Sequence, residues 1–314
     1  MTNKIDNKLD PNWVTGFVDG EGCFHISLAK NKNRKREWHV QACFQIGLHL
    51  KDKDLLLQIK TFFGEIGTIL VDKDRVFVTY SVRSLNEIVK IIIPHFEKYP
   101  LITQKQSDFI IWKMIVGLMS KGKHLNEDGL IQIINLKASL NNRLPDRLKI
   151  SFPEFTKLDK PKMSIPDHID YNWIAGFFTG EGCFFRNISK SNTRKLSYSI
   201  LLQIIVGQHS RDKLLMNNLI NTLGCGIISK RSNQNLITIR ITKFEDIYNK
   251  IIPLLMQYKI KGVKFLDFQD FCKAAELINK GVHLTLEGLE EIRIIKSGMN
   301  TGRVHPVYTI YSVD

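Results

Sequence analysis

The sequence predicts an α+β protein made of two pseudo-symmetric copies of one αββαββαα unit, each with an antiparallel sheet. A duplicated motif, a constant repeat spacing and strands with one polar face lead to this prediction. The motif WVTGFVDGEGCF begins at Trp13 and returns as WIAGFFTGEGCF at Trp173. Shorter matches recur 160 or 159 residues apart, such as HLKDK at His49 and HSRDK at His209. Two copies are too few for a solenoid, so a fused pseudo-dimer is the better interpretation.

The motif itself predicts a buried helix at residues 13–20 and again at 173–180, because these stretches are apolar almost all round. Asn12 and Asn172 precede the two stretches and are expected to be the N-caps. Glycines four residues apart lie on one face of a helix, which lets two backbones approach closely. We therefore expect a central two-helix interface, with Glu21 and Glu181 emerging together at the ends of the helices.

Period-two alternation predicts the strands that follow each motif. Polar and apolar side chains alternate between His39 and Ile46, and residues 198–204 repeat the pattern with more apolar side chains. Hairpin tips rich in lysine and arginine are expected at residues 30–36 and 190–195. The other expected elements are helices at 53–63 and 213–223, strands at 67–71, 75–82, 226–231 and 236–241, and closing helices at 86–95, 105–119 and 126–141.

Four prolines separate the two copies, at positions 145, 153, 161 and 166, in a segment with few periodic apolar residues. The segment 144–170 is therefore expected to be a linker. It would divide the chain into an N-terminal repeat, residues 1–143, and a C-terminal repeat, residues 171–314. A chain of 314 residues is long enough for two such domains.

Composition and charge narrow the class of partner. The formal net charge is +14, with +7 in residues 1–150 and +7 in the remainder, so the excess is not one basic tail. A basic surface shared by both copies favours a polyanionic partner such as nucleic acid. No apolar run reaches the ~18–20 residues of a membrane span, so no membrane partner is expected. The five cysteines include no close pair, which argues against a disulfide framework or a structural zinc, and no signal or transit peptide is visible.

The uncovered faces of the predicted sheets carry hydrogen-bonding side chains flanked by lysines and arginines. Such side chains read base edges and contact phosphates, and a two-stranded ribbon fits the major groove of B-DNA. We expect the two sheets to form a saddle on double-stranded DNA. The expected DNA-binding residues are His25, Ser27, Asn31, Lys32, Arg34, Lys35, Arg36, His39, Gln41, Gln45, Asn187, Ser189, Lys190, Arg194, Lys195, Ser199, Gln203, Ser229, Lys230 and Arg231.

Each copy of the motif places one glutamate between glycines at the end of a buried helix, Glu21 and Glu181. Phosphodiester hydrolysis can use divalent metals to generate the attacking hydroxide and to neutralise the leaving oxygen. Carboxylates and main-chain carbonyls suit Mg²⁺. Both glutamates are therefore candidate metal ligands. Asp19 has Thr179 as its counterpart, so its role is expected to be structural.

The stretches VTGFVDGEG at Val14 and IAGFFTGEG at Ile174 resemble the two signature helices of LAGLIDADG homing endonucleases. From about residue 11 to residue 305 the chain resembles the single-chain members encoded in fungal mitochondrial introns. The resemblance implies a monomer that cuts both strands of a long asymmetric DNA target across the minor groove and leaves 3′ overhangs. It also implies mitochondrial localisation and a divalent metal cofactor, Mg²⁺ or alternatively Mn²⁺.

The resemblance assigns roles to individual residues. Glu21 and Glu181 would bind metal and act as catalytic acids, assisted by the main-chain oxygens of Gly20 and Gly180. The basic residues nearest the cut would be Lys105, Lys264 and Arg231. Gln45 would be a polar residue beside the metals, but the second copy has the apolar Ile205 at that position.

Two other functions share this scaffold. The first is a maturase, which would bind the host intron RNA and assist group I intron splicing. The second is a DNA-binding regulator without cleavage. The intact pair Glu21 and Glu181 favours cleavage, because neither alternative needs both carboxylates. A metabolic enzyme is not supported, since the sequence has no Gly-rich phosphate loop, no Ser/His/Asp spacing and no zinc pattern.

Overall fold

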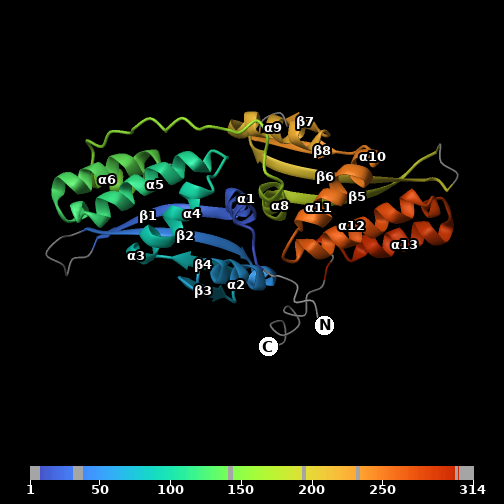
Figure 1. The fold of residues 1–314 in the computed structure, drawn as a ribbon, viewed down its shortest axis with the longest axis horizontal. Coiled ribbons are helices and arrows are strands. Elements are labelled where there is room, and N and C mark those ends of the chain that lie inside the picture. Colours follow the sequence, from blue (N-terminus) through green and yellow to red (C-terminus); the bar gives the residue numbers. More distant parts are fainter. Residues whose placement is uncertain are drawn as a thin grey trace. The chain divides into compact units, whose positions relative to one another are not determined.

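The computed structural model describes residues 8–30, 38–140, 144–192, 196–230, 234–300 and residue 303, apart from the side chain of Arg186. The chain divides into two compact units, Met1–Ile165 and Pro166–Asp314. Each unit contains a four-stranded antiparallel sheet with helices packed along one of its faces (Figure 1). The predicted α+β class is confirmed. How the signature helices of the two units pair stays a prediction.

The first unit begins with helix α1 (Pro11–Glu21), which leads directly into the sheet. The sheet has the strand order β1-β2-β4-β3. The other elements of this unit are β1 (Gly22–Lys30), β2 (Trp38–His49), α2 (Lys53–Phe62), β3 (Thr68–Asp72), β4 (Phe77–Val82), α3 (Leu85–Glu87), η2 (Ile88–Ile92), α4 (Ile93–Lys98), α5 (Lys105–Ser120), α6 (Glu127–Ser139) and α7 (Asp146–Ser151), with short turns η1 (Leu50–Asp52) and η3 (Lys123–Leu125).

The second unit repeats this order, starting with helix α8 (Tyr171–Glu181). Its strand order β5-β6-β8-β7 is that of the first sheet. Its other elements are β5 (Gly182–Lys190), β6 (Tyr198–His209), α9 (Lys213–Leu223), β7 (Ile227–Lys230), β8 (Leu236–Ile241), α10 (Phe244–Asp246), η5 (Ile247–Ile251), α11 (Ile252–Tyr258), α12 (Lys264–Asn279) and α13 (Leu286–Ser297), with short turns η4 (Ser210–Asp212) and η6 (Val282–Leu284).

The signature helices begin two residues earlier than predicted, and the predicted N-caps are wrong. The side chain of Asp10, not that of Asn12, caps α1 and accepts hydrogen bonds from the N–H groups of Asn12 and Trp13. Asp170 caps α8 in the same way. Pro11 explains the shift in the first unit, because proline favours the first helical position and leaves the residue before it as the cap.

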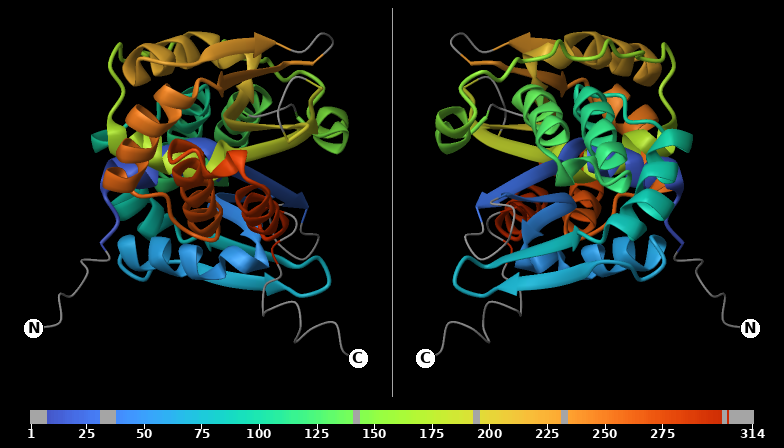
Figure 2. Two further views of the ribbon diagram at one scale, coloured as in Figure 1. Left: turned by 90° about the vertical axis from the view of Figure 1, so that its right-hand side faces the viewer. Right: turned by 90° about the vertical axis from the view of Figure 1, so that its left-hand side faces the viewer.

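The core of each unit lies between the sheet and its helices, as the alternation predicts. Phe24 of β1 is buried, and its ring centroid lies 5.1–5.3 Å from those of Phe44, Phe96, Phe109 and Trp112. These aromatic rings join β1 and β2 to α4 and α5. In the second unit Phe184 occupies the equivalent position against Phe268 and Phe271 of α12. The two long helices of each unit run side by side along the sheet (Figure 1, Figure 2).

The closing helix predicted at residues 86–95 is interrupted in both units. A π-helical turn, Ile88–Ile92 or Ile247–Ile251, separates a short first turn from the helix that continues. Pro94 and Pro253 lie near the start of that continuation. Proline lacks an N–H donor and its ring crowds the preceding turn, so the wider π-turn accommodates it without ending the helix.

The segment predicted as a linker, 144–170, has structure that the sequence did not suggest. Its first part forms α7 and packs on the first unit, where Leu148 is buried. Arg147 donates to the Leu28 carbonyl of the edge strand β1. Lys160 forms an ion pair of 2.6 Å with Asp108 in the first turn of α5. The expected limits of the repeats, 1–143 and 171–314, stay a prediction.

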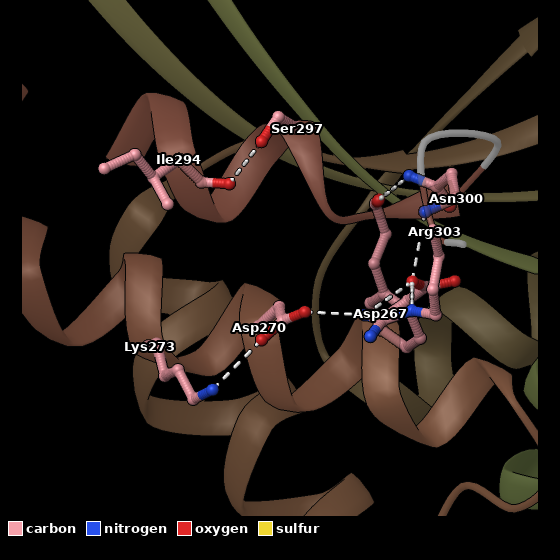
Figure 3. A network of polar contacts seen from close by, with 8 residues as sticks. Asp267, Asp270, Lys273, Ile294, Ser297, Asn300 and Arg303 are labelled. Atoms are coloured by element: carbon pink, nitrogen blue, oxygen red, sulfur yellow. Dashed lines mark hydrogen bonds and ion pairs between the residues drawn. The ribbon is translucent and has the colours of Figure 1, made fainter. Parts of the chain in front are cut away.

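The second unit anchors its last described residue in a similar way. Asp267 follows Asp108 by 159 residues and lies in the first turn of α12. It accepts hydrogen bonds from Arg303, which also pairs with Asp270 at 2.6 Å (Figure 3). Asn300 donates its N–H to the same Asp267 carboxylate. Both units therefore use this aspartate to hold the chain that follows the repeat.

None of the helices in the described part of the chain combines the length and the apolar character that crossing a membrane requires.

Candidate active site

Each unit presents one glutamate at the point where the signature helix becomes the first strand. Glu21 is the last residue of α1, Glu181 is the last residue of α8, and both are partly exposed. Gly22 and Gly182 follow them and are buried. A Cβ atom on Gly22 would lie 2.5 Å from Val18 Cγ1, and one on Gly182 would lie 2.5 Å from the Phe178 oxygen. Only glycine fits there, because the strand turns back directly over the last turn of the helix.

A lysine from the long helix of each unit reaches the carbonyl that precedes this glutamate. The Lys105 ammonium donates to the oxygen of Gly20 at 3.1 Å and to that of Val18 at 2.8 Å. The Lys264 ammonium donates to the oxygen of Gly180. Helix carboxyl ends carry partial negative charge, which favours a cation there. Within each unit the structure thus brings together the glycine carbonyl and the lysine that the family resemblance assigned to the site.

Asp19 positions the segment that carries Lys105. It is 1% exposed and accepts hydrogen bonds from Ile102 N at 2.9 Å, Thr103 N at 3.2 Å and the Thr103 hydroxyl. The Thr103 oxygen in turn accepts from the N–H of Lys105, the first residue of α5. The expectation of a structural role for Asp19 is confirmed. In the second unit Thr179 donates to the Ala175 carbonyl and accepts from Lys261 N, a weaker connection.

The donor groups of each unit suit a hard divalent cation. Glu21 with the Gly20 carbonyl, and Glu181 with the Gly180 carbonyl, are oxygen ligands, and both carbonyls already accept a lysine ammonium. Among the described residues no cluster of three or more His, Cys, Asp or Glu side chains could hold a metal. A site with few protein ligands fits Mg²⁺, which usually keeps several waters. It does not fit zinc, which takes nitrogen and sulfur ligands in closed sites.

The residues expected to contact DNA from the first unit lie on one face of its sheet. Cross-strand pairing sets Ser27 opposite Gln41, and the burial of β1 alternates along the strand. His25, Gln45 and His39 share this face, which the helices do not cover. The structure therefore brings these five side chains to one surface. Their contact with DNA stays a prediction.

The second unit presents fewer polar groups on the equivalent face. Asn187, Ser189, Ser199 and Ser229 lie on it and are at least partly exposed, whereas Gln203 is only 7% exposed. Phe185 and Leu201 are also on this face, 40% and 41% exposed. Lys190 and Lys230 stand at strand ends and belong by alternation to the opposite face.

The remaining expected residues lie outside the described part of the chain. They are Asn31, Lys32, Arg34, Lys35 and Arg36 of the first hairpin tip, Arg194 and Lys195 of the second, and Arg231.

Comparison with known proteins decides the family. The model of the LAGLIDADG endonuclease family matches residues 14–116 and 174–275, which include both glutamates and both lysines. The chain belongs to the LAGLIDADG endonuclease family. The crystal structure of the I-SmaMI LAGLIDADG homing endonuclease bound to cleaved DNA superimposes with a TM-score of 0.92 at 41% identity, covering 95% of this chain and 99% of that one. The I-LtrWI homing endonuclease bound to target DNA gives a TM-score of 0.91 at 34% identity, covering 94% and 99%.

Curated relatives come from fungi. "Probable intron-encoded endonuclease 2" of Neurospora crassa is 40% identical over 301 residues, which cover 93% of this chain. "Probable intron-encoded endonuclease 3" of the same organism is 38% identical over 285 residues, which cover 90% of this chain. The chain spans 65% and 53% of the lengths of these two relatives. The family resemblance seen in the sequence is thus confirmed.

Two arginines on the uncovered sheet faces were missed in the sequence. Arg83 directly follows β4; burial raises the pKa of the Cys43 thiol, and Arg83 partly offsets this rise. Burial lowers the pKa of the neighbouring His25, and the positive charges of Lys137 and Arg83 lower it further, so this histidine stays neutral at pH 7. Arg240 lies within β8 and shares its face with Thr238. The alternation of the segment LITIRI could have revealed Arg240, because only Thr238 and Arg240 interrupt its apolar residues.

Proposed function

We propose that this chain is a site-specific homing endonuclease that binds a long asymmetric double-stranded DNA target and hydrolyses both strands. The cut would be staggered and would leave 3′ overhangs. The observation that carries the proposal is the repeated arrangement of a terminal glutamate, the preceding glycine carbonyl and a lysine ammonium in both units. Two phosphodiester bonds need two such centres, and the chain has one for each.

Relatives support this proposal. I-SmaMI has been crystallised with cleaved DNA, and with an uncleaved DNA target in the presence of calcium ions. Other solved structures of I-SmaMI carry alanine in place of one or both of two lysines that are 159 residues apart. Lys105 and Lys264 have the same separation. The agreement supports a role for this lysine pair in the reaction.

Each site residue would have its own role in this reaction. Glu21 and Gly20 would hold one divalent cation, Mg²⁺ or alternatively Mn²⁺, and Glu181 and Gly180 a second. Bound there, such an ion lowers the pKa of a bound water and stabilises negative charge on phosphate oxygens. Lys105 and Lys264 would stand beside the cut, where an ammonium group stabilises the charge that develops on the phosphate. Gln45 would position groups beside the first centre by hydrogen bonding.

The sheets would supply binding and sequence preference. The net charge of +14 suits the DNA backbone, and the polar face of the first sheet offers hydrogen-bond donors and acceptors to base edges. The second sheet adds Phe185 and Leu201 at partly exposed positions, which suit apolar contacts such as the thymine methyl. Two faces of different chemistry read different half-sites, hence the proposal of an asymmetric target bound by a single chain.

The biological role would be intron homing in a fungal mitochondrion. Two Neurospora crassa relatives are named as probable intron-encoded endonucleases, and a Saccharomyces cerevisiae relative, 25% identical over 327 residues, is named an uncharacterised mitochondrial protein. A double-strand break in an intronless allele would initiate copying of the intron.

The experiment that tests this function is selection of cleaved molecules from a randomised duplex library with Mg²⁺. The Glu21→Gln protein is the matched control. Enrichment of one long site, cut with a constant stagger by the wild type only, would support the proposal. If no duplex is enriched and the same preparation binds structured intron RNA, the proposal is wrong and the maturase alternative replaces it.

A further inference from the structure

The two sheets differ in the cross-strand row that lies beside the candidate metal ligands. Each row begins two residues after the glutamate of its unit. The first-unit row consists of Cys23, Gln45, Ser81 and Thr68, paired across β1, β2, β4 and β3. The second-unit row consists of Cys183, Ile205, Arg240 and Ile227, paired across β5, β6, β8 and β7. The rows are equivalent in register but not in chemistry.

The first-unit row is polar and uncharged. The hydroxyls of Thr68 and Ser81 lie 3.2 Å apart and bond to each other. The amide of Gln45 is partly exposed beside them, within weak contact of the Cys43 thiol. The second-unit row has Ile205 in place of this amide, and an aliphatic side chain forms no hydrogen bond. That unit therefore needs another polar group if its row is to contact the substrate.

Arg240 supplies that group. The alternating burial of β8 places it on the face that the helices leave uncovered. Its Nε atom is shielded from solvent and has no hydrogen-bond partner among the described residues. A buried N–H of a charged group is costly to leave unpaired. Arg240 as a whole is partly exposed, so its guanidinium keeps donor capacity that the described residues do not use.

The chemistry of that partner follows from the shape of the guanidinium and its neighbours. The planar fork of arginine presents parallel donors that match two oxygens of a phosphate. Ile205 and Ile227 flank Arg240 on both sides of the row, and apolar neighbours strengthen its attraction for an anion. Because the row adjoins Glu181, the anion within reach is the DNA backbone next to the cut.

We propose that Arg240 binds a DNA backbone phosphate beside the cleavage point of the second unit, where it replaces the role of Gln45 in the first. This inference rests on the proposed endonuclease function. The first unit also has an arginine on this face, but Arg83 lies one row further from the glutamate, level with Cys43. The second unit has Thr242 at that position. The arginine is therefore shifted by two residues towards the active site in the second unit.

The test follows each DNA strand separately. The target found by selection carries a different dye on each 5′ end, and wild type, Arg240→Met, Arg240→Lys and Gln45→Met are compared in single-turnover cleavage with Mg²⁺. Arg293→Met, on helix α13 away from the sheet face, is the matched control. Binding is measured over a range of salt concentrations. A series of targets is also prepared, each with one central phosphate replaced by an uncharged methylphosphonate. The affinity of wild type and of Arg240→Met is measured for every target in the series.

We expect Arg240→Met to slow cleavage of one strand at least about tenfold more than the other, so that nicked DNA accumulates. Gln45→Met should slow the opposite strand, and Arg240→Lys should retain much of the wild-type rate. The salt slope of Arg240→Met should fall by about 0.9, the loss of one phosphate contact. At one position of the series, the methylphosphonate should weaken binding by wild type. The same substitution should leave binding by Arg240→Met unchanged, because that variant has already lost the contact.

Other results would overturn the inference. An unchanged salt slope with an altered preference at one base pair would mean that Arg240 reads a base. If Arg240→Met slowed cleavage of both strands equally, Arg240 would act only by stabilising the fold. If Arg240→Met does not fold, as judged by its melting temperature, the double variant Ile205→Gln/Arg240→Ser replaces it. This variant gives the second unit the glutamine and serine of the first-unit row, and it should cleave both strands. A wild type that cuts neither strand of any target would contradict the proposed function itself, independently of Arg240.

Discussion

Replacing Asp19 should damage the first unit far more than the equivalent change damages the second. Its carboxylate accepts hydrogen bonds from two buried N–H groups, of Ile102 and Thr103, and from the Thr103 hydroxyl. Asp19→Ala leaves all three donors without a partner in a position that is 1% exposed. Each buried unsatisfied donor costs about 1–3 kcal/mol, so the three donors together should lower the free energy of unfolding by at least about 3 kcal/mol.

Asparagine should not rescue this position. The two carboxylate oxygens each face a backbone N–H, and an amide would set its own NH₂ against one of them. We expect Asp19→Asn to cost about 2 kcal/mol or more. Because Thr103 also accepts from Lys105 N, both variants should displace the lysine and lower cleavage at least about tenfold where the protein is still folded.

Urea denaturation followed by circular dichroism measures these losses, and strand-resolved cleavage at low temperature measures activity. Thr179→Ala is the matched control, because Thr179 is also buried, at 5% exposed, but among the described residues it bonds to the Ala175 carbonyl and accepts a long bond from Lys261 N. It should cost about 1 kcal/mol. Equal losses for Asp19→Ala and Thr179→Ala would refute the reasoning that the Asp19 carboxylate holds the Lys105 segment.

Three further predictions concern the site and the pH dependence of folding. Glu21→Gln and Glu181→Gln should each lower double-strand cleavage more than about 100-fold. Their affinity for DNA, measured by gel shift, should stay near that of the wild type. Cleavage retained by both variants would contradict the assignment of the metal ligands. Lys105→Met and Lys264→Met should lower the single-turnover rate about 10²–10³-fold with little change in Kd, and a loss of affinity alone would assign both lysines to binding. Burial lowers the pKa of His95 from 6.5 to about 4, so the unfolded chain takes up a proton first as the pH falls. The free energy of unfolding should therefore decrease by about 3 kcal/mol between pH 6.5 and 4. Urea denaturation of His95→Gln should show a smaller decrease, because this contribution is removed. A decrease equal to that of the wild type would show that His95 is not responsible.

Local patterns predicted the elements of this fold well where one element dominates its own sequence. The apolar signature motif marked α1 and α8, and the period-two alternation marked β2 and β6, within a few residues of their observed limits. The caps were missed because Asp10 and Asn12 are both good capping residues, and proline at position 11 decides between them. Helix α7 was missed because six residues between prolines carry almost no periodic signal.

The candidate site divides in the same way. Glu21 and Glu181 were identified from the duplicated motif, because glycine on both sides of an acidic residue at a helix end is an unusual local pattern. Lys105 and Lys264 were assigned only through the family resemblance, and they lie 85 and 84 residues from the glycines that they contact. No local pattern reports a contact over that separation. Arg240 could have been found from the alternation of its strand, but its place in the row beside Ile205 follows only from the strand pairing, as does that of Arg83 beside Cys43.

The sequence by itself determined that the protein is a duplication, that each copy is an α+β unit, and that each unit carries one glutamate at the end of a buried helix. Those properties depend on spacing and periodicity, which are visible along the chain. Only the tertiary structure decided that the lysine ammonium groups contact the glycine carbonyls. It also decided that Arg240 lies opposite Ile205 in the second sheet, at the position where Ser81 lies opposite Gln45 in the first. The physical reason is that strand register and helix docking are set by packing between distant segments, and one residue of slip would move every side chain to the other face.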